Sequence, residues 1–353
     1  MRIIHTADLH LDSSLETNMN SIKSKERKRE LLLTFQRLVT YASSNNIDAI
    51  IIAGDMFDKA RVSIKTKEFI VDLIHSNRNI DFIYVSGNHD EDVFLSSLDP
   101  KPDNLYIFDN KWKTLSYKDV DITAVVYNDT SKVLYDTLSL NKERLNIVVM
   151  HGPIATSIDN GIHLNSLKNK GIDYLALGHI HKYQKSELDS RGVYAYSGCL
   201  EGRGFDEIGP KGFVILDINK SSIESQFVKF AKRELREIVV DITSLDSWID
   251  IRKNISLKLS GIPQSDMVKV TLTGYYDLDL IKQIELLDES LNEEFYFARV
   301  EDNSKLRINP KDYENDISLK GEFIRNVLSS DLAEDEKSAV IEYGIKALMK
   351  EEL

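Results

Sequence analysis

Five short apolar runs, separated by stretches of helical periodicity, constrain the fold of this chain more than any other feature of its sequence. They occupy residues 3–5, 47–53, 80–85, 147–150 and 174–177. Uninterrupted apolar strands are typical of sheets that are covered on both faces. Apolar residues recur at helical spacing between the first and second runs and between the second and third, at Leu31, Leu32, Phe35, Leu38, Val39 and Ala42 and at Phe69, Ile70, Leu73 and Ile74. This alternation predicts an α/β fold.

Two further segments, residues 114–127 and 193–230, contain strand patterns with no helix between them. We expect these strands to form a second, hairpin-rich sheet that packs on the first. Residues 236–302 then show a strand, helix, strand, helix, strand pattern, which is compact enough for a small domain.

A polar linker and two amphipathic helices, around residues 319–328 and 340–348, complete the chain. The 353 residues allow two or three domains, and we place them at 1–230, 231–302 and 303–353. The last segment either docks on its parent domain or engages another chain.

The only cysteine is Cys199, which excludes an internal disulfide framework and any cysteine-rich zinc module. We expect Cys199 to be a packed thiol rather than a nucleophile. The sequence also contains neither a leader-like apolar run near its start nor roughly 18 consecutive apolar residues, the length that a membrane helix needs. These features predict a cytoplasmic protein without membrane attachment.

Each of the five apolar runs leads directly into polar residues of metal-ligand types. The segments are Asp8-Leu9-His10, Gly54-Asp55-Met56-Phe57-Asp58, Gly87-Asn88-His89-Asp90, His151-Gly152 and Gly178-His179-Ile180-His181, and they hold 5 of the 8 histidines. Sites in α/β folds form outside the carboxyl ends of the strands, so these segments are expected to converge. The spacing of two in Asp8-x-His10 and His179-x-His181 puts both side chains on one face.

The types of ligand indicate the ion and the reaction. Carboxylates, imidazoles and an amide without thiolates suit Mn²⁺, Fe²⁺, Mg²⁺ or Zn²⁺ in an open site, and there are enough of them for two ions that share one carboxylate. Two such ions activate water for attack on a phosphoryl centre. The sequence therefore predicts phosphoester hydrolysis, with Mn²⁺ as the first choice of metal.

The five segments together resemble the signature of the calcineurin-like metallophosphoesterase superfamily (D-x-H, G-D-x-x-D, G-N-H-D/E, H-G, G-H-x-H) over residues 8–181. Lys59-Ala60-Arg61 after Asp58 departs from protein phosphatases and resembles SbcD-type DNA double-strand-break repair exonucleases of the bacterial YhaO-like branch. Residues 4–13, 196–203 and 318–325 fit the same branch. The resemblance implies a four-layer α-β-β-α sandwich with a smaller α+β capping domain that positions DNA and a C-terminal helical tail.

The resemblance also implies roles for single residues. One ion would be held by Asp8, His10, Asp55 and His181, and the other by Asp55, Asn88, His151 and His179. His89 would protonate the leaving oxygen and Asp58 would orient His89. Lys59, Arg61 and Arg203 are expected to bind substrate. The implied partners are DNA, an SMC-like (SbcC-type) coiled-coil ATPase that binds the tail, and a second copy of the chain in a homodimer.

The net charge of −12 opposes a nucleic-acid substrate, because phosphate attraction supplies most non-specific affinity. Residues 1–230 hold 28 Lys and Arg against 31 Asp and Glu, a net charge of −3, so most of the net negative charge lies in the remainder. Residues 21–67 hold 10 basic against 5 acidic residues, and we expect them to line the rim of the site. The first hypothesis is a DNA nuclease. The alternatives are a stand-alone metallophosphoesterase of nucleotides or other small phosphodiesters, and a non-catalytic scaffold, which the complete ligand set disfavours.

Overall fold

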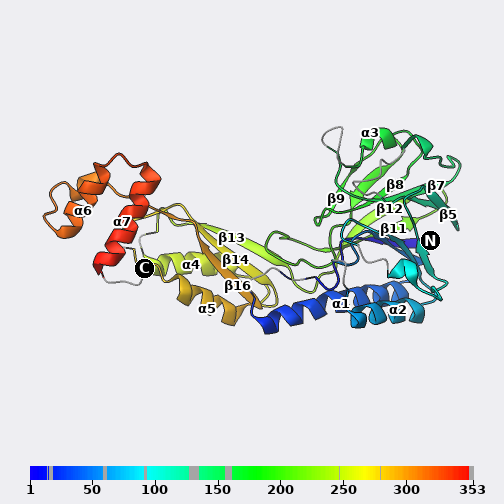
Figure 1. Ribbon diagram of the computed structural model, residues 1–353, viewed down its shortest axis with the longest axis horizontal. Helices are drawn as coiled ribbons and strands as arrows, with labels where there is room; N and C mark the ends of the chain where they lie inside the picture. The colour runs from blue at the N-terminus through cyan, green and yellow to red at the C-terminus, as the bar shows by residue number, and fades with distance from the viewer. Residues whose placement is uncertain are drawn as a thin grey trace. The chain divides into compact units, whose positions relative to one another are not determined.

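The computed structural model describes residues 1–13, 15, 19–58, 62–90, 94–126, 135–155, 161–245, 247–278 and 280–349. The chain divides into two compact units, Met1–Glu234 and Leu235–Leu353 (Figure 1). The sequence predicts domain boundaries after residues 230 and 302. The first of these lies four residues before the observed division, and no division is found at the second.

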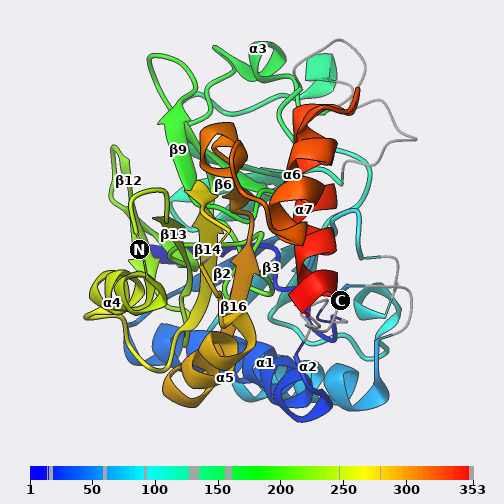
Figure 2. The same cartoon turned by 90° about the vertical axis from the view of Figure 1, so that its left-hand side faces the viewer.

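The first sheet of the N-terminal unit contains six strands in the order β12-β11-β1-β2-β3-β4. Their bounds are β1 (Arg2–Thr6), β2 (Ala49–Ala53), β3 (Asp81–Val85), β4 (Leu105–Ile107), β11 (Gly212–Ile218) and β12 (Ile223–Lys229). Strands β1 to β4 are parallel to one another, and β11 runs antiparallel to both of its neighbours, β1 and β12. Helices α1 (Ser21–Ser44) and α2 (Ile64–Ser76) lie side by side on one face (Figures 1 and 2), where Phe35 and Ile70 share a core with Ile50 and Phe82.

The second sheet packs face to face on the first. Its order is β5-β6-β7-β8-β10-β9, with bounds β5 (Lys113–Tyr117), β6 (Val120–Ala124), β7 (Leu145–His151), β8 (Tyr174–Gly178), β9 (Gln184–Glu187) and β10 (Val193–Tyr196). Ile3 and Ile51 of the first sheet share a core with Ile147 and Val149 of the second. The outer face is covered by the short helix α3 (Leu164–Leu167), the turn η2 (Tyr135–Thr137) and loops. The predicted α-β-β-α sandwich is confirmed, with a thin fourth layer.

The assignment of strands to sheets was partly wrong. We expected the five apolar strands in one sheet and the later hairpins in another. The structure places β7 and β8 in the second sheet and the β11-β12 hairpin in the first, beside β1. Both sheets of this sandwich are covered on both faces, so apolar runs occur in each of them and do not identify the sheet to which a strand belongs.

A network of buried charges fixes helix α1 to the end of the N-terminal unit. Glu30 accepts hydrogen bonds from Arg27, Lys232 and Arg233, and Arg27 also reaches Glu201 at 3.4 Å. The Arg27 side chain is 1% exposed and that of Glu30 is 3% exposed. The sequence-based expectation that Arg27 belongs to a basic rim is therefore wrong for this residue.

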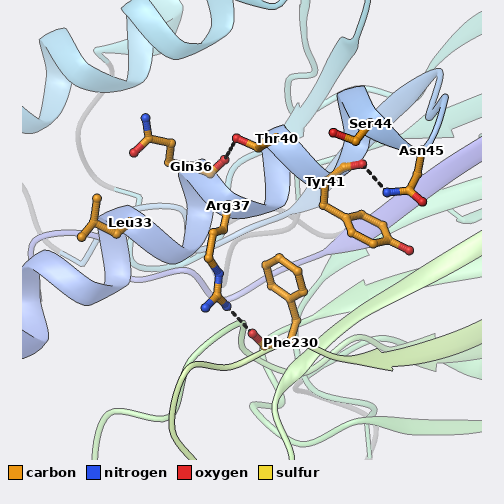
Figure 3. A pocket seen from close by; sticks show the side chains of 8 residues that line it. All are labelled: Leu33, Gln36, Arg37, Thr40, Tyr41, Ser44, Asn45 and Phe230. Carbon is orange, nitrogen blue, oxygen red and sulfur yellow. Dashed lines mark hydrogen bonds between the residues drawn. The ribbon is translucent and has the colours of Figure 1, made fainter.

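Further along α1, a groove of roughly 680 Å³ is lined by residues of the helix and by Phe230 (Figure 3). Arg37 donates a hydrogen bond to the carbonyl of Phe230 and lies 4.6 Å above its ring. Tyr41 contacts the same ring edge-on. These contacts hold the segment after β12 against the helix.

The C-terminal unit contains a parallel sheet in the order β13-β14-β16 with α4 and α5 as crossovers (Figure 1). Its elements are β13 (Leu235–Asp241), α4 (Trp248–Leu259), β14 (Met267–Thr273), β15 (Tyr275–Tyr276), α5 (Ile284–Glu294), β16 (Phe297–Asp302), β17 (Lys305–Leu306), η3 (Pro310–Tyr313), α6 (Leu319–Leu328) and α7 (Glu334–Met349). Ile324, Val327, Ile341 and Ile345 of the last two helices belong to the core of this unit. The tail thus docks on its parent domain.

None of the helices in the described parts of the chain is both long enough and apolar enough to cross a bilayer.

Candidate metal centre

The carboxyl ends of five strands from two sheets meet at one edge of the sandwich. The loops after β1 and β2 are joined by backbone hydrogen bonds, from Asp8 N–H to the Gly54 carbonyl at 3.0 Å and from His10 N–H to the Asp55 carbonyl at 2.9 Å. The sheets are joined where His179 N–H donates to Asp8 Oδ1 at 2.8 Å. The predicted convergence of the segments is observed, although their strands do not share one sheet.

The backbone at this edge is strained. Asp8, His10, Asp55 and His179 have φ values of 54°, 44°, 52° and 107°. Residues other than glycine rarely adopt this left-handed backbone region. Those that do are concentrated at functional sites. At Gly87 a Cβ would lie 2.2 Å from Asp55 Oδ1, so only glycine lets the loop after β3 approach this carboxylate.

The first group of ligand-type side chains, the His10 cluster, consists of Asp8, His10 and His181. His10 Nε2 lies 3.1 Å from His181 Nε2, while the Nδ1 atoms lie 3.2 Å from Asp58 Oδ1 and 2.6 Å from Glu207 Oε1. If each Nδ1 donates to its carboxylate, two Nε2 lone pairs face each other. Such an arrangement fits a cation that both nitrogens coordinate.

The second group, the His151 cluster, consists of Asp55, His151 and His179, with Asn88 beside them. His151 Nδ1 donates to the Ala53 carbonyl at 2.9 Å, so Nε2 is the nitrogen that faces the other ligand-type atoms. Asn88 Oδ1 lies 2.9 Å from His151 Nε2 and 3.1 Å from His179 Nδ1. The amide oxygen of Asn88, the imidazoles of His151 and His179 and the carboxylate of Asp55 therefore converge on one position.

Asp55 connects the two clusters. Its Oδ2 lies 3.3 Å from His151 Nε2 and 3.7 Å from His10 Nε2, while Oδ1 accepts from the backbone N–H of His89 at 2.9 Å. Burial alone would raise the pKa of Asp55, but the hydrogen bond and charge of His151 outweigh it and lower the pKa to about 2.

Asp8 has the opposite environment. Burial raises the pKa of its carboxyl to about 6, and its Oδ2 is buried without a hydrogen-bond partner. A buried oxygen without a partner is costly unless a cation supplies one. The facing nitrogens, the shared Asp55 carboxylate and the unpartnered Asp8 oxygen all fit two divalent ions.

His89 and Asp58 lie together next to the His10 cluster. His89 Nδ1 is 3.2 Å from Asp58 Oδ1, the same oxygen that lies 3.2 Å from His10 Nδ1. Burial opposes ionisation of Asp58, yet the hydrogen bonds of its neighbours, with that of His10 the largest, hold its pKa well below the usual value. The His89 side chain is 48% exposed, so it is accessible to a substrate.

Of the three residues that the resemblance assigns to substrate binding, the structure describes only Arg203. Lys59 and Arg61 lie outside the described residues. Arg203 lies in the site, but its guanidinium donates to Glu207 Oε1 at 2.9 Å and approaches Asp58 Oδ2 at 3.7 Å. It is therefore already engaged by carboxylates of the protein.

Sequence reasoning missed Glu207. This residue is 5% exposed and contacts His181, yet it lies in a loop and follows no strand end. No pattern in the sequence distinguishes it from other surface-type glutamates. Its proximity to His181 results from the folding of residues 197–211 back onto the site.

Comparisons with known proteins identify several similar chains. A family model described as calcineurin-like phosphoesterase matches residues 1–183. The uncharacterized metallophosphoesterase YhaO of Bacillus subtilis is 25% identical over 260 residues, which are 69% of this chain but only 64% of that relative. The DNA double-strand break repair protein Mre11 of Nanoarchaeum equitans is 24% identical over 359 residues, 90% of each chain. Among solved structures, TT1561 of Thermus thermophilus aligns with 64% of this chain and 98% of its own, at 12% identity and a TM-score of 0.43.

Proposed function

Because this chain belongs to the calcineurin-like phosphoesterase family, whose members are metal-dependent hydrolases, we propose that it is a two-metal phosphodiesterase that cleaves DNA. The observation that carries the proposal is the shared carboxylate of Asp55, whose Oδ2 lies within 3.3 Å of one histidine cluster and 3.7 Å of the other. A carboxylate in this position suits two neighbouring ions that act on one phosphate.

In this proposal each ion has its own set of protein ligands. Asp8, His10, Asp55 and His181 hold the first, and Asp55, Asn88, His151 and His179 hold the second. When bound, divalent ions in such a pair polarise the phosphoryl group and lower the pKa of a water molecule to near neutrality. We propose Mn²⁺ as the metal, with Fe²⁺, Mg²⁺ and Zn²⁺ as the other candidates.

His89 acts on the leaving group. Its ring is half-exposed beside the His10 cluster, and its Nδ1 lies 3.2 Å from Asp58 Oδ1, which leaves Nε2 for a substrate. A histidine in this position donates its proton to the leaving oxygen as the phosphoester bond breaks. Asp58 orients the ring.

Two observations support DNA as the substrate. Several relatives bear the name DNA double-strand break repair protein Mre11, and one of them aligns over 90% of this chain. Helix α1 also exposes Lys25 and Arg29 in its first turns, where basic side chains could contact phosphates. The net charge of −12 favours the alternative, a stand-alone enzyme for nucleotides or other small phosphodiesters. A role in DNA repair, a homodimer and a cytoplasmic location remain parts of the proposal.

A substrate comparison tests this function. The metal-free protein is expected to be inactive, and added Mn²⁺ should restore hydrolysis of bis-p-nitrophenyl phosphate and cleavage of labelled single- or double-stranded DNA, because the water and the phosphate both need the ions. A phosphopeptide serves as the control substrate. Hydrolysis of the small ester without DNA cleavage, also after addition of an SMC-like ATPase, would support the alternative. If the protein hydrolysed none of these substrates, both candidate activities would be refuted.

We further propose that the C-terminal helices bind an SMC-like coiled-coil ATPase through side chains that do not serve the core. Leu319 of α6 is 67% exposed and Tyr343 of α7 is 62% exposed. Deletion of residues 318–353 would be a poor test, since Ile324 and Ile341 of the same helices are buried in the core.

Surface substitutions separate the two roles of these helices. Leu319→Glu with Tyr343→Glu is expected to weaken binding of the ATPase by about 30-fold or more, because apolar anchors of an interface typically contribute 2 kcal/mol or more. Hydrolysis of bis-p-nitrophenyl phosphate should stay unchanged. Glu322→Lys is the control: it changes the charge of an exposed position on α6, the helix of Leu319, and removes no apolar side chain. Unchanged co-purification of the doubly substituted protein would contradict this binding surface.

A further inference from the structure

The two histidine clusters differ in the groups that support their imidazoles. In the His10 cluster both Nδ1 atoms face carboxylates, Asp58 at 3.2 Å and Glu207 at 2.6 Å. In the His151 cluster, His151 Nδ1 faces the neutral carbonyl of Ala53 at 2.9 Å. A carboxylate partner orients an imidazole and makes its other nitrogen a stronger ligand than a carbonyl partner does.

The carboxylate of Glu207 is held in place by one arginine. Arg203 donates to Glu207 Oε1 from Nη2 at 2.9 Å and from Nε at 3.1 Å, and its backbone N–H donates to Oε2 at 2.8 Å. The same guanidinium reaches Asp58 Oδ2 at 3.7 Å. One partly buried cation therefore lies between the two carboxylates that support His181 and His10.

We propose that Glu207, fixed by Arg203, is a positioning residue for His181 and makes the His10 cluster the tighter of the two metal sites. This inference rests on the proposed function, because it requires that both clusters bind ions. It assigns Arg203 to the support of the metal site, whereas the sequence suggested that Arg203 binds substrate. Glu207 belongs to neither proposed ligand set and acts through His181.

The first test measures metal binding directly. Glu207→Gln keeps the size of the side chain and removes its charge, so the tighter Mn²⁺ dissociation constant in isothermal titration calorimetry is expected to rise by about 10- to 100-fold while the weaker one stays constant. Glu187→Gln is the matched control, since Glu187 is an exposed glutamate on β9, the edge strand of the second sheet. The control should bind Mn²⁺ as the wild type does.

A double-mutant cycle shows whether Glu207 acts through His181. In a His181→Ala background, Glu207→Gln should change Mn²⁺ affinity by less than about twofold, because its target is gone. In a His179→Ala background it should keep its full effect, because His179 belongs to the other cluster. Equal effects in the two backgrounds would overturn the inference.

Thermal unfolding separates support of the metal from support of the fold. For Glu207→Gln the Tm of the metal-free protein should stay near that of the wild type, and the rise in Tm on adding Mn²⁺ should shrink. An equal fall in Tm with and without metal, at unchanged Mn²⁺ affinity, would show a structural role only. If Glu207→Gln does not fold, Arg203→Lys carries the test, with a smaller loss expected at the same site.

The two proposals fail in different ways. A wild-type protein that binds no divalent ion would refute the proposed function itself. A wild type that binds two Mn²⁺ ions with affinities that Glu207→Gln leaves unchanged would refute only the role of Glu207.

Discussion

Replacement of His89 by alanine is expected to lower kcat by about 10²- to 10⁴-fold, the usual contribution of a general acid. Mn²⁺ binding should persist, because His89 belongs to neither proposed ligand set and its backbone N–H, which donates to Asp55 Oδ1 at 2.9 Å, remains in the variant. Cleavage of labelled DNA and calorimetric titration with Mn²⁺ on the same preparation measure both quantities.

The leaving group provides a second measurement for the same variant. A proton is needed most when the leaving oxygen is a poor one, as in DNA, and least for a nitrophenolate. His89→Ala should therefore impair DNA cleavage more than ester hydrolysis. His75→Ala, at an exposed position near the end of α2, is the control and should leave kcat unchanged. Wild-type turnover of DNA by His89→Ala would exclude the assigned role.

Glu30→Gln is expected to lower the free energy of unfolding of the N-terminal unit by about 3–5 kcal/mol, the typical cost of breaking a buried ion pair. The reason is that the buried Arg27 and Arg233 guanidiniums, together with the Lys232 ammonium, would lose the carboxylate that they share. Glu68→Gln, on the exposed side of α2, should change this free energy by no more than about 0.5 kcal/mol.

The two tryptophans allow the unfolding of each unit to be followed separately. Trp112 lies in the N-terminal unit and Trp248 in the C-terminal unit. In a Trp248→Phe background, the fluorescence of Trp112 in urea reports the N-terminal unit alone. A midpoint for Glu30→Gln equal to that of the control would contradict the assigned stabilisation.

The same carboxylate makes stability depend on pH. Burial alone would raise the pKa of Glu30, but hydrogen bonds from Arg233, Lys232 and Arg27 outweigh it and lower the pKa from 4.5 to about 2. A group with a lowered pKa in the folded state stabilises the fold above its unfolded pKa, and this contribution is lost as the pH falls through the folded value. The stability difference between wild type and Glu30→Gln should thus be full above pH 4.5 and shrink toward pH 2.

The sequence allowed the metal centre to be predicted more completely than the fold around it. Asp8, His10 and His151 follow apolar strands directly, and a strand end fixes the position of its next residues whichever sheet holds it. The assignment of β7 and β8 to a sheet depends on which strands pair, and strand pairing leaves no local signal in residues that are buried on both faces.

The supporting residues escaped prediction for a related reason. Arg27 lies in a run of basic residues that is typical of a solvated helix face, and only the folded chain brings Glu201 and Arg233 to it. Glu207 likewise meets His181 through a loop closure of 26 residues. Contacts between segments far apart in the chain determine these pairs, and the residue types by themselves do not.

One oxygen atom of Asp58 serves two histidines with different tasks. Its Oδ1 lies 3.2 Å from Nδ1 of His10, a proposed metal ligand, and 3.2 Å from Nδ1 of His89, the proposed acid. Substitutions at these three positions must therefore be epistatic, since a change that relaxes one imidazole frees the shared oxygen for the other. A substitution at position 58 that changes the orientation of His89 therefore also changes the support of His10, and with it the affinity for metal.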